Sequence, residues 1–163
     1  MKIRSLYLIA SIVGLMYVSA ARAQDMHHHG NDVSEQLGEV NFTVSCSAAS
    51  QKQFNRATAL LHSFWYSEAE KAYSASAMGE PACVMAQWGV AMSLYHPVWA
   101  PAATAELQKG WAAAEKAKSL PAKTDRERVY IAAIETFFRG SDKLDHRTCA
   151  LAHEKAMERV YLT

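Results

Sequence analysis

The sequence is poor in the residues that break up a packed core. It has four Pro and seven Gly among 163 residues, which excludes collagen-like and linker-like material. The formal net charge is only +1, so the concentrated basic surface of nucleic-acid binders is missing and no nucleic-acid partner is predicted. Hydrophobic residues make up 50% of the chain, enough for one packed domain.

Familiar catalytic signatures are also missing from the sequence. It contains no G-x-S-x-G, no H-E-x-x-H, no P-loop and no dinucleotide-binding pattern. The charged runs 68–71 and 125–128 are expected to be solvated helix surface. The sequence therefore nominates no catalytic residue and no cofactor, and an enzyme is not favoured.

The N-terminus has the three parts of an export signal. Lys2 and Arg4 precede an apolar run over residues 6–18, and an A-x-A cleavage pattern follows at 21–23. The apolar run is shorter than the roughly 20 residues of a membrane-spanning helix. We therefore predict a cleaved signal peptide over residues 1–23 and an exported chain, periplasmic or secreted, that keeps no membrane span. An uncleaved anchor is the alternative.

The cysteines predict one disulfide. Without a C-x-x-C pattern, thioredoxin chemistry and c-type haem attachment have no support. In an oxidising compartment Cys46 can pair with Cys83, 37 residues away. Closing that loop stabilises a fold by about 3–4 kcal/mol in the chain-entropy description. Cys149 lies in a helical pattern and is expected to be a small buried side chain.

Residues 24–46 are predicted to be a polar, flexible leader that ends in a short extended segment. His27, His28 and His29 lie in the leader; they are expected to be solvated, although such a tract can bind metal opportunistically. Near its end, Val40, Phe42 and Val44 alternate with polar residues, which is the period of an extended chain.

Residues 47–163 are predicted to be entirely helical. Gly79 is expected to cap a helix before Pro81, and Thr124 with Glu127 forms a capping-box pattern. The predicted helices cover about 47–63, 66–78, 82–95, 103–119, 124–138 and 145 to the end. They form an all-α, antiparallel helix-turn-helix array with pairs at about 47–80, 81–120 and 124–163.

The array carries an internal repeat of 34 residues. A shift by 34 aligns Gln53 with Gln87, Phe54 with Trp88, Ala57 with Ala91, Leu60 with Leu94, and His62 with His96. This period is typical of tetratricopeptide repeats. Ala69, Tyr73 and Pro81 match the A-x-x-x-F and later Pro of that pattern. The first repeat fits well, the second is lengthened by the loop at 96–101, and the third is degenerate.

The stretches 60–66 (LLHSFWY), 68–72 (EAEKA) and 88–97 (WGVAMSLYHP) make the chain resemble exported bacterial tetratricopeptide-repeat proteins. The resemblance covers about residues 38–163. It implies an α-solenoid that acts as an interaction scaffold. Such proteins are longer, and the last predicted helix has no polar cap, so the chain is expected to be an N-terminal piece of a longer array.

The repeat frame predicts a concave groove that binds a protein or peptide partner. The groove candidates are Gln51, Phe54, Thr58, Leu61 and His62, and one repeat later Met85, Trp88, Met92, Tyr95 and His96. Aromatic, Met and His side chains suit an extended or helical peptide. The alternative for Phe54, Leu61 and Trp88 is that they pack between helices.

Histidines offer an alternative function, metal or cofactor binding. His62 and His96 lie on neighbouring helices of the predicted array, roughly 8–10 Å apart, and His146 is a further candidate ligand. A transition-metal site needs three or four ligands, and the sequence does not bring a third to the same place.

Overall fold

The computed structural model describes residues 37–95 and 101–162. The predicted signal peptide, most of the leader with its three histidines, and His96 lie outside the described residues. Within them the chain has six α-helices and no strand, so the all-α prediction is confirmed. In this part of the chain no helix combines the length and the apolar character needed to cross a membrane.

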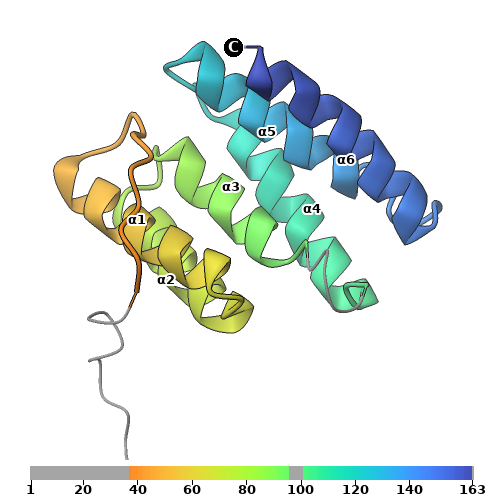
Figure 1. Cartoon of the computed structure of the whole chain (residues 1–163), viewed down its shortest axis with the longest axis horizontal. Coiled ribbons are helices and arrows are strands. Elements are labelled where there is room, and N and C mark those ends of the chain that lie inside the picture. The colour runs from red at the N-terminus through yellow and green to blue at the C-terminus, as the bar shows by residue number, and fades with distance from the viewer. Residues whose placement is uncertain (1–36, 96–100, 163) are drawn as a thin grey trace, which may run out of the picture. The chain divides into compact units, whose positions relative to one another are not determined.

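The helices follow one another with short connections (Figure 1). They are α1 (Ala48–His62), α2 (Tyr66–Gly79), α3 (Val84–Ser93), α4 (Thr104–Ser119), α5 (Asp125–Phe138) and α6 (His146–Tyr161). Their ends agree with the predicted bounds to about two residues, because local capping signals set most of them.

Polar caps begin three of the helices. The side chain of Ser47 caps α1, and Asp145 caps α6. At the start of α5, the Thr124 hydroxyl accepts from the Glu127 N–H at 3.2 Å, and the Glu127 carboxylate accepts from the Thr124 N–H at 3.3 Å. The predicted capping box is thus present, and it leaves Glu127 facing the start of the helix.

The end of α2 differs from the prediction. Gly79 is the last helical residue, and Glu80 is the C-cap with φ −137°; Gly79 as the cap was wrong. Pro81 follows directly and cannot continue the helix, so no left-handed glycine is needed here. Among the described residues, the glycine with positive φ is Gly140, at 82°, in the turn between α5 and α6.

The turn between α1 and α2 places a bulky residue where glycine is usual. The N–H of Phe64 donates to Leu61 O at 3.1 Å, and the N–H of Trp65 donates to Leu60 O at 3.0 Å. This is a Schellman ending, whose left-handed residue is normally Gly. Here it is Phe64, with φ 62°. A Cβ in this conformation costs about 1–2 kcal/mol.

We expect Phe64→Gly to be more stable than Phe64→Ala by about 1 kcal/mol in urea unfolding. Both variants lose the ring, and only Ala keeps the Cβ at positive φ. The control is Ser63, whose φ is −88°; there Ser63→Gly should be no more stable than Ser63→Ala. Equal stability of the two Phe64 variants would contradict the strain.

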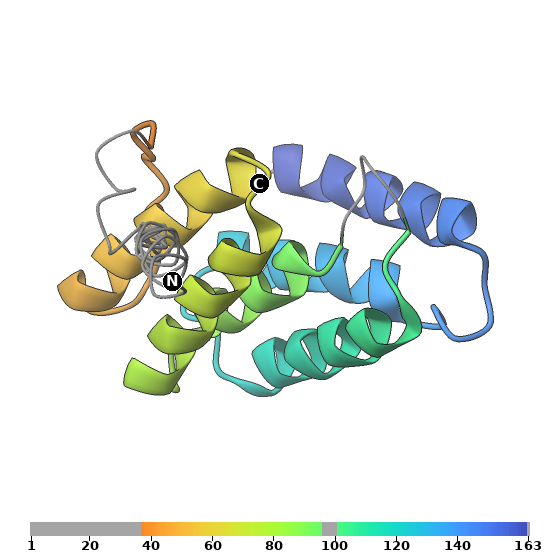
Figure 2. The same cartoon turned by 90° about the horizontal axis from the view of Figure 1, so that it is seen from below.

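The helices pack in sequence order, with one additional pattern. Each helix contacts the next one, and α3 also contacts α1 and α5. Figure 2 shows α5 between α4 and α6. We call the side built by α1, α3 and α5 the odd-helix face. The largest fully buried side chains of the core are Phe54, Leu60, Tyr73, Met85, Ile134, Phe137 and Phe138.

Two glycines allow neighbouring helices to approach each other closely. A Cβ on Gly89 of α3 would overlap the ring of Tyr73 from α2, and a Cβ on Gly110 of α4 would overlap the ring of Phe138 from α5. The Tyr73 hydroxyl and Thr58 Oγ1 are hydrogen-bonded at 2.8 Å. Tyr73 therefore fills the space between α1, α2 and α3 without an unpaired buried hydroxyl.

His153 of α6 is buried against α5. Its Nδ1 lies 2.8 Å from the carbonyl oxygen of Ala133, which can only accept, so we assign the proton to Nδ1. The ring also packs on Tyr95 at 5.0 Å between centroids. Burial lowers the pKa of His153, and the hydrogen bond to Ala133 opposes that change only in part.

This lowered pKa predicts a loss of stability in mild acid. Between the ordinary histidine pKa of 6.5 and the lowered value in the folded protein, the unfolded chain binds more protons. The contribution of His153 to the free energy of unfolding should therefore have its full value above about pH 6.5 and decrease as the pH falls below it. Urea unfolding of His153→Gln should show less dependence on pH in this window; an unchanged slope would contradict the prediction.

Candidate functional site

The chain ahead of α1 lies on the odd-helix face. We call residues Leu37–Ser45 the 37–45 segment; it is drawn in orange in Figure 1 and has no regular secondary structure. Asn41 and Thr43 are exposed, Phe42 is half-buried and Val44 is buried. This alternation agrees with the period-two pattern of the sequence, so one side of the segment faces the helices.

Phe42 contacts one aromatic ring from each odd helix. Its ring centroid lies 5.6 Å from Phe54 of α1, 6.2 Å from Trp88 of α3 and 5.2 Å from Tyr130 of α5. The guanidinium of Arg126 covers the ring at 4.1 Å. We call these four partners the Phe42 site. Aromatic and cation–π contacts of this kind hold a ring by both shape and charge.

Gln51 of α1 binds the main chain of the segment at two points. Its Nε2 donates to Phe42 O at 2.9 Å, and its Oε1 accepts from Val44 N–H at 2.8 Å. Gln51 Nε2 also donates to Asn55 Oδ1 at 2.7 Å. The Gln51 amide thus pairs with one backbone C=O and one backbone N–H of the segment, as a neighbouring β-strand would. These hydrogen bonds do not depend on which side chains the bound segment carries.

The charged start of α5 binds the next residue of the segment. The N–H of Ser45 donates to Glu127 Oε1 at 2.7 Å, and Lys123 Nζ donates to Ser45 O at 2.8 Å. Glu127 is buried, and its other oxygen accepts from the N–H groups of Lys123 and Thr124. The capping carboxylate of α5 thus also recognises an extended main chain.

A disulfide holds the chain directly after the segment. It joins Cys46 to Cys83, at the start of α3, with Cα atoms 5.3 Å apart; this is the pair predicted from the sequence. Beside it, the Ser47 hydroxyl donates to Glu80 Oε2 at 2.6 Å and Ser47 N–H donates to the same oxygen at 3.0 Å, and these hydrogen bonds lower the pKa of Glu80. Cys149 is free and buried, as expected, and burial raises the pKa of its thiol.

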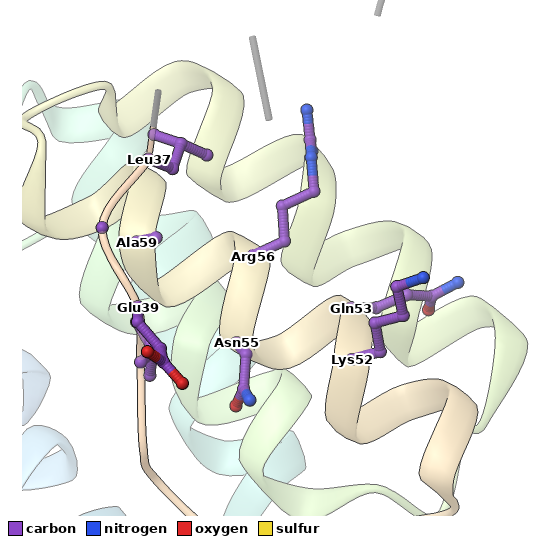
Figure 3. Close-up of a pocket in the computed structure, with 9 residues that line it drawn as sticks. Leu37, Glu39, Lys52, Gln53, Asn55, Arg56 and Ala59 are labelled. Carbon is purple, nitrogen blue, oxygen red and sulfur yellow. The ribbon is translucent and has the colours of Figure 1, made fainter. Parts of the chain in front are cut away.

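The N-terminal part of the segment is less closely packed. A pocket of about 410 Å³ lies between residues 37–40 and α1. Figure 3 shows Leu37 and Glu39 alongside the helix that carries Asn55, Arg56 and Ala59. The segment is therefore held most firmly from Phe42 onward.

Of the ten predicted groove residues, five are buried in the part of the chain that the structure describes. Phe54, Thr58, Leu61, Met85 and Trp88 are all buried. Thr58 uses its hydroxyl on Phe54 O and Tyr73. With the 37–45 segment in place these five side chains are therefore covered, as the packing alternative for Phe54, Leu61 and Trp88 describes. Of these, Phe54 and Trp88 still meet Phe42.

The remaining predicted residues lie apart. Met92 and Tyr95 are half-buried, and the Tyr95 ring lies 4.4 Å from Phe137. His62 is exposed at the end of α1, and His146 is half-buried with its ring 5.6 Å from Phe137. In the described ranges, no three His, Cys, Asp or Glu side chains gather where they could hold a metal ion.

Sequence reasoning missed the site's other half. Tyr130, Arg126, Lys123 and Glu127 come from α5 and the residues just before it. The sequence predicts a capping box at Glu127 and solvated helix surface for both Glu127 and Arg126; for Glu127 the second prediction was wrong, because its side chain is buried. The alternation around Phe42 was a usable signal, because it showed that one side of the segment is covered, although not by which helices.

Comparisons with protein-family models, with curated proteins and with solved structures found no match to the chain.

Proposed function

We propose that this chain is an exported helical-repeat scaffold of the tetratricopeptide kind, which binds an extended segment of a partner protein on its odd-helix face. The observation that carries the proposal is the 37–45 segment itself. The face already holds an extended chain through Gln51, Glu127 and Lys123, which contact main-chain atoms. Such contacts suit peptides of varied sequence.

The repeat reading is supported by equivalent burial at positions 34 residues apart. Phe54 and Trp88 are both buried, as are the pairs Ala57 with Ala91 and Leu60 with Leu94. Contacts of α3 with α1 and α5 also follow the alternation expected when helix pairs stack and their first helices form one side. Close stacking of helix pairs needs a small residue opposite a large one, and Gly89 of α3 lies against the ring of Tyr73 from α2 in this way.

Site-specific cross-linking in the source cells tests the proposal. A photoreactive residue in place of Arg126, which is exposed beside Phe42, should give a discrete adduct with another protein. This replacement removes the guanidinium over Phe42 but keeps Gln51, Glu127 and Lys123, which bind the main chain. The same residue in place of Lys71, exposed on α2, is the matched control and should give none. Identical adduct patterns at both positions would count against the proposal.

A further inference from the structure

We propose that the 37–45 segment is an intramolecular ligand, and that a partner binds by placing the aromatic side chain of its own extended segment in the Phe42 site. This inference rests on the proposed function and names the chemistry of its ligand: a peptide with one aromatic residue and free backbone N–H groups at the second and third residues after it. The segment then regulates access to the face.

The segment is held by one inserted side chain and by hydrogen bonds to its main chain. Phe42 supplies the side chain that enters the site, and its ring meets α1, α3 and α5 together. The hydrogen bonds at Phe42 O, Val44 N–H and both main-chain groups of Ser45 use the backbone alone. Any extended peptide with an aromatic residue at the position of Phe42 satisfies the same set. Proline two or three residues later removes a required donor.

The partner's side chains at the alternate positions are free to vary. Asn41 and Thr43 point away from the helices and are exposed. The position of Val44 is buried and requires an apolar side chain. The ligand class is therefore an aromatic residue, a variable one and an apolar one in extended conformation, which an exchanging peptide can present without rearranging the helices.

Replacement of the segment by a partner peptide can begin at residues 37–40. A pocket lies between residues 37–40 and α1, where only Leu37 packs against the hydrophobic core, while the disulfide at Cys46 fixes the other end of the segment. An incoming chain can lie along α1 first and then replace Phe42. Because the segment is tethered, it competes at an effective concentration that a free peptide must overcome.

Peptide binding to the full chain tests the inference. The probe is a fluorescent synthetic peptide with the sequence of residues 37–45, LGEVNFTVS, measured by anisotropy. Phe42→Ala removes the tethered anchor, so it should bind the probe about tenfold or more tightly than the unmodified chain. Thr43→Ala changes an exposed side chain of the same segment and should bind like the unmodified chain. A probe with Ala in place of Phe should bind Phe42→Ala no more tightly than it binds the unmodified chain.

A folded Phe42→Ala chain that does not bind the probe, or binds both probes equally, would overturn the inference. Val44→Ala provides a second release of the segment if Phe42→Ala unfolds, because it removes a buried side chain of the segment and leaves the contacting residues of the face unchanged. If Phe42→Ala binds the probe but no protein is cross-linked at position 126, the segment is an intramolecular ligand and the proposed function is wrong. If a protein is cross-linked at position 126 but Phe42→Ala does not bind the probe, the proposed function is supported and the intramolecular ligand is not.

Discussion

Replacing the disulfide with alanine, in Cys46→Ala/Cys83→Ala, is expected to lower the free energy of unfolding by about 3–4 kcal/mol. The bond closes a loop of 37 residues that contains all of α1 and α2. Without it the unfolded chain gains the freedom of that loop, and the folded chain loses the tie between the 37–45 segment and the start of α3. Urea unfolding of the oxidised chain and the double variant measures the difference.

Two controls separate the effect of losing the disulfide bond from the effect of replacing the cysteine side chains. A dithiol added to the unmodified chain should lower its stability to that of the double variant, while the double variant itself should not respond. Cys149→Ala leaves the disulfide in place, so it should keep the response to the dithiol. A chain whose unfolding is insensitive to reduction would show that the loop contributes nothing.

Trp88→Ala is expected to cost about 3–5 kcal/mol, the range for deleting a large buried aromatic side chain. Trp88 is 7% exposed, and its ring contacts Phe42, Phe54 and Tyr130. The cavity lies beneath the 37–45 segment, so the segment should also become an early site of limited proteolysis. Denaturant unfolding and mapping of the first cleavage site measure the two effects.

Trp65→Ala is the matched control, because it deletes the same side chain from a position that is 47% exposed. It should cost clearly less and leave the first cleavage site unchanged. Early cleavage in both variants would attribute the effect to general loss of stability. Early cleavage in Trp88→Ala alone would attribute it to the Phe42 site.

The helices were predictable because their limits are local. Ser47, Thr124 and Asp145 each cap a helix within three residues of their own position, and Pro81 ends α2 whatever surrounds it. Gly79 misled the prediction because glycine permits a left-handed cap without requiring one. The turn at Phe64 had no local signal at all, since its residue is one that usually avoids positive φ.

The site was predictable only in part, because it is assembled from distant segments. Gln51 binds a main chain seven residues away, and the repeat frame did point to it. Lys123 reaches Ser45 across 78 residues, and no spacing in the sequence relates the two. Trp88 was placed on the correct helix, but its burial depends on the segment that covers it, which periodicity within the helix does not show.

The contact of Phe42 with three helices has a mechanical consequence. Arrays of helix pairs bend through small rotations between one pair and the next. In the proposed repeat array, a ring packed among Phe54, Trp88 and Tyr130 would span two such joints and stiffen both. In the proposed array, the size of the ring in this position would set the bend, and we expect exchange of Phe42 for a partner's ring to change the spacing between the helix pairs.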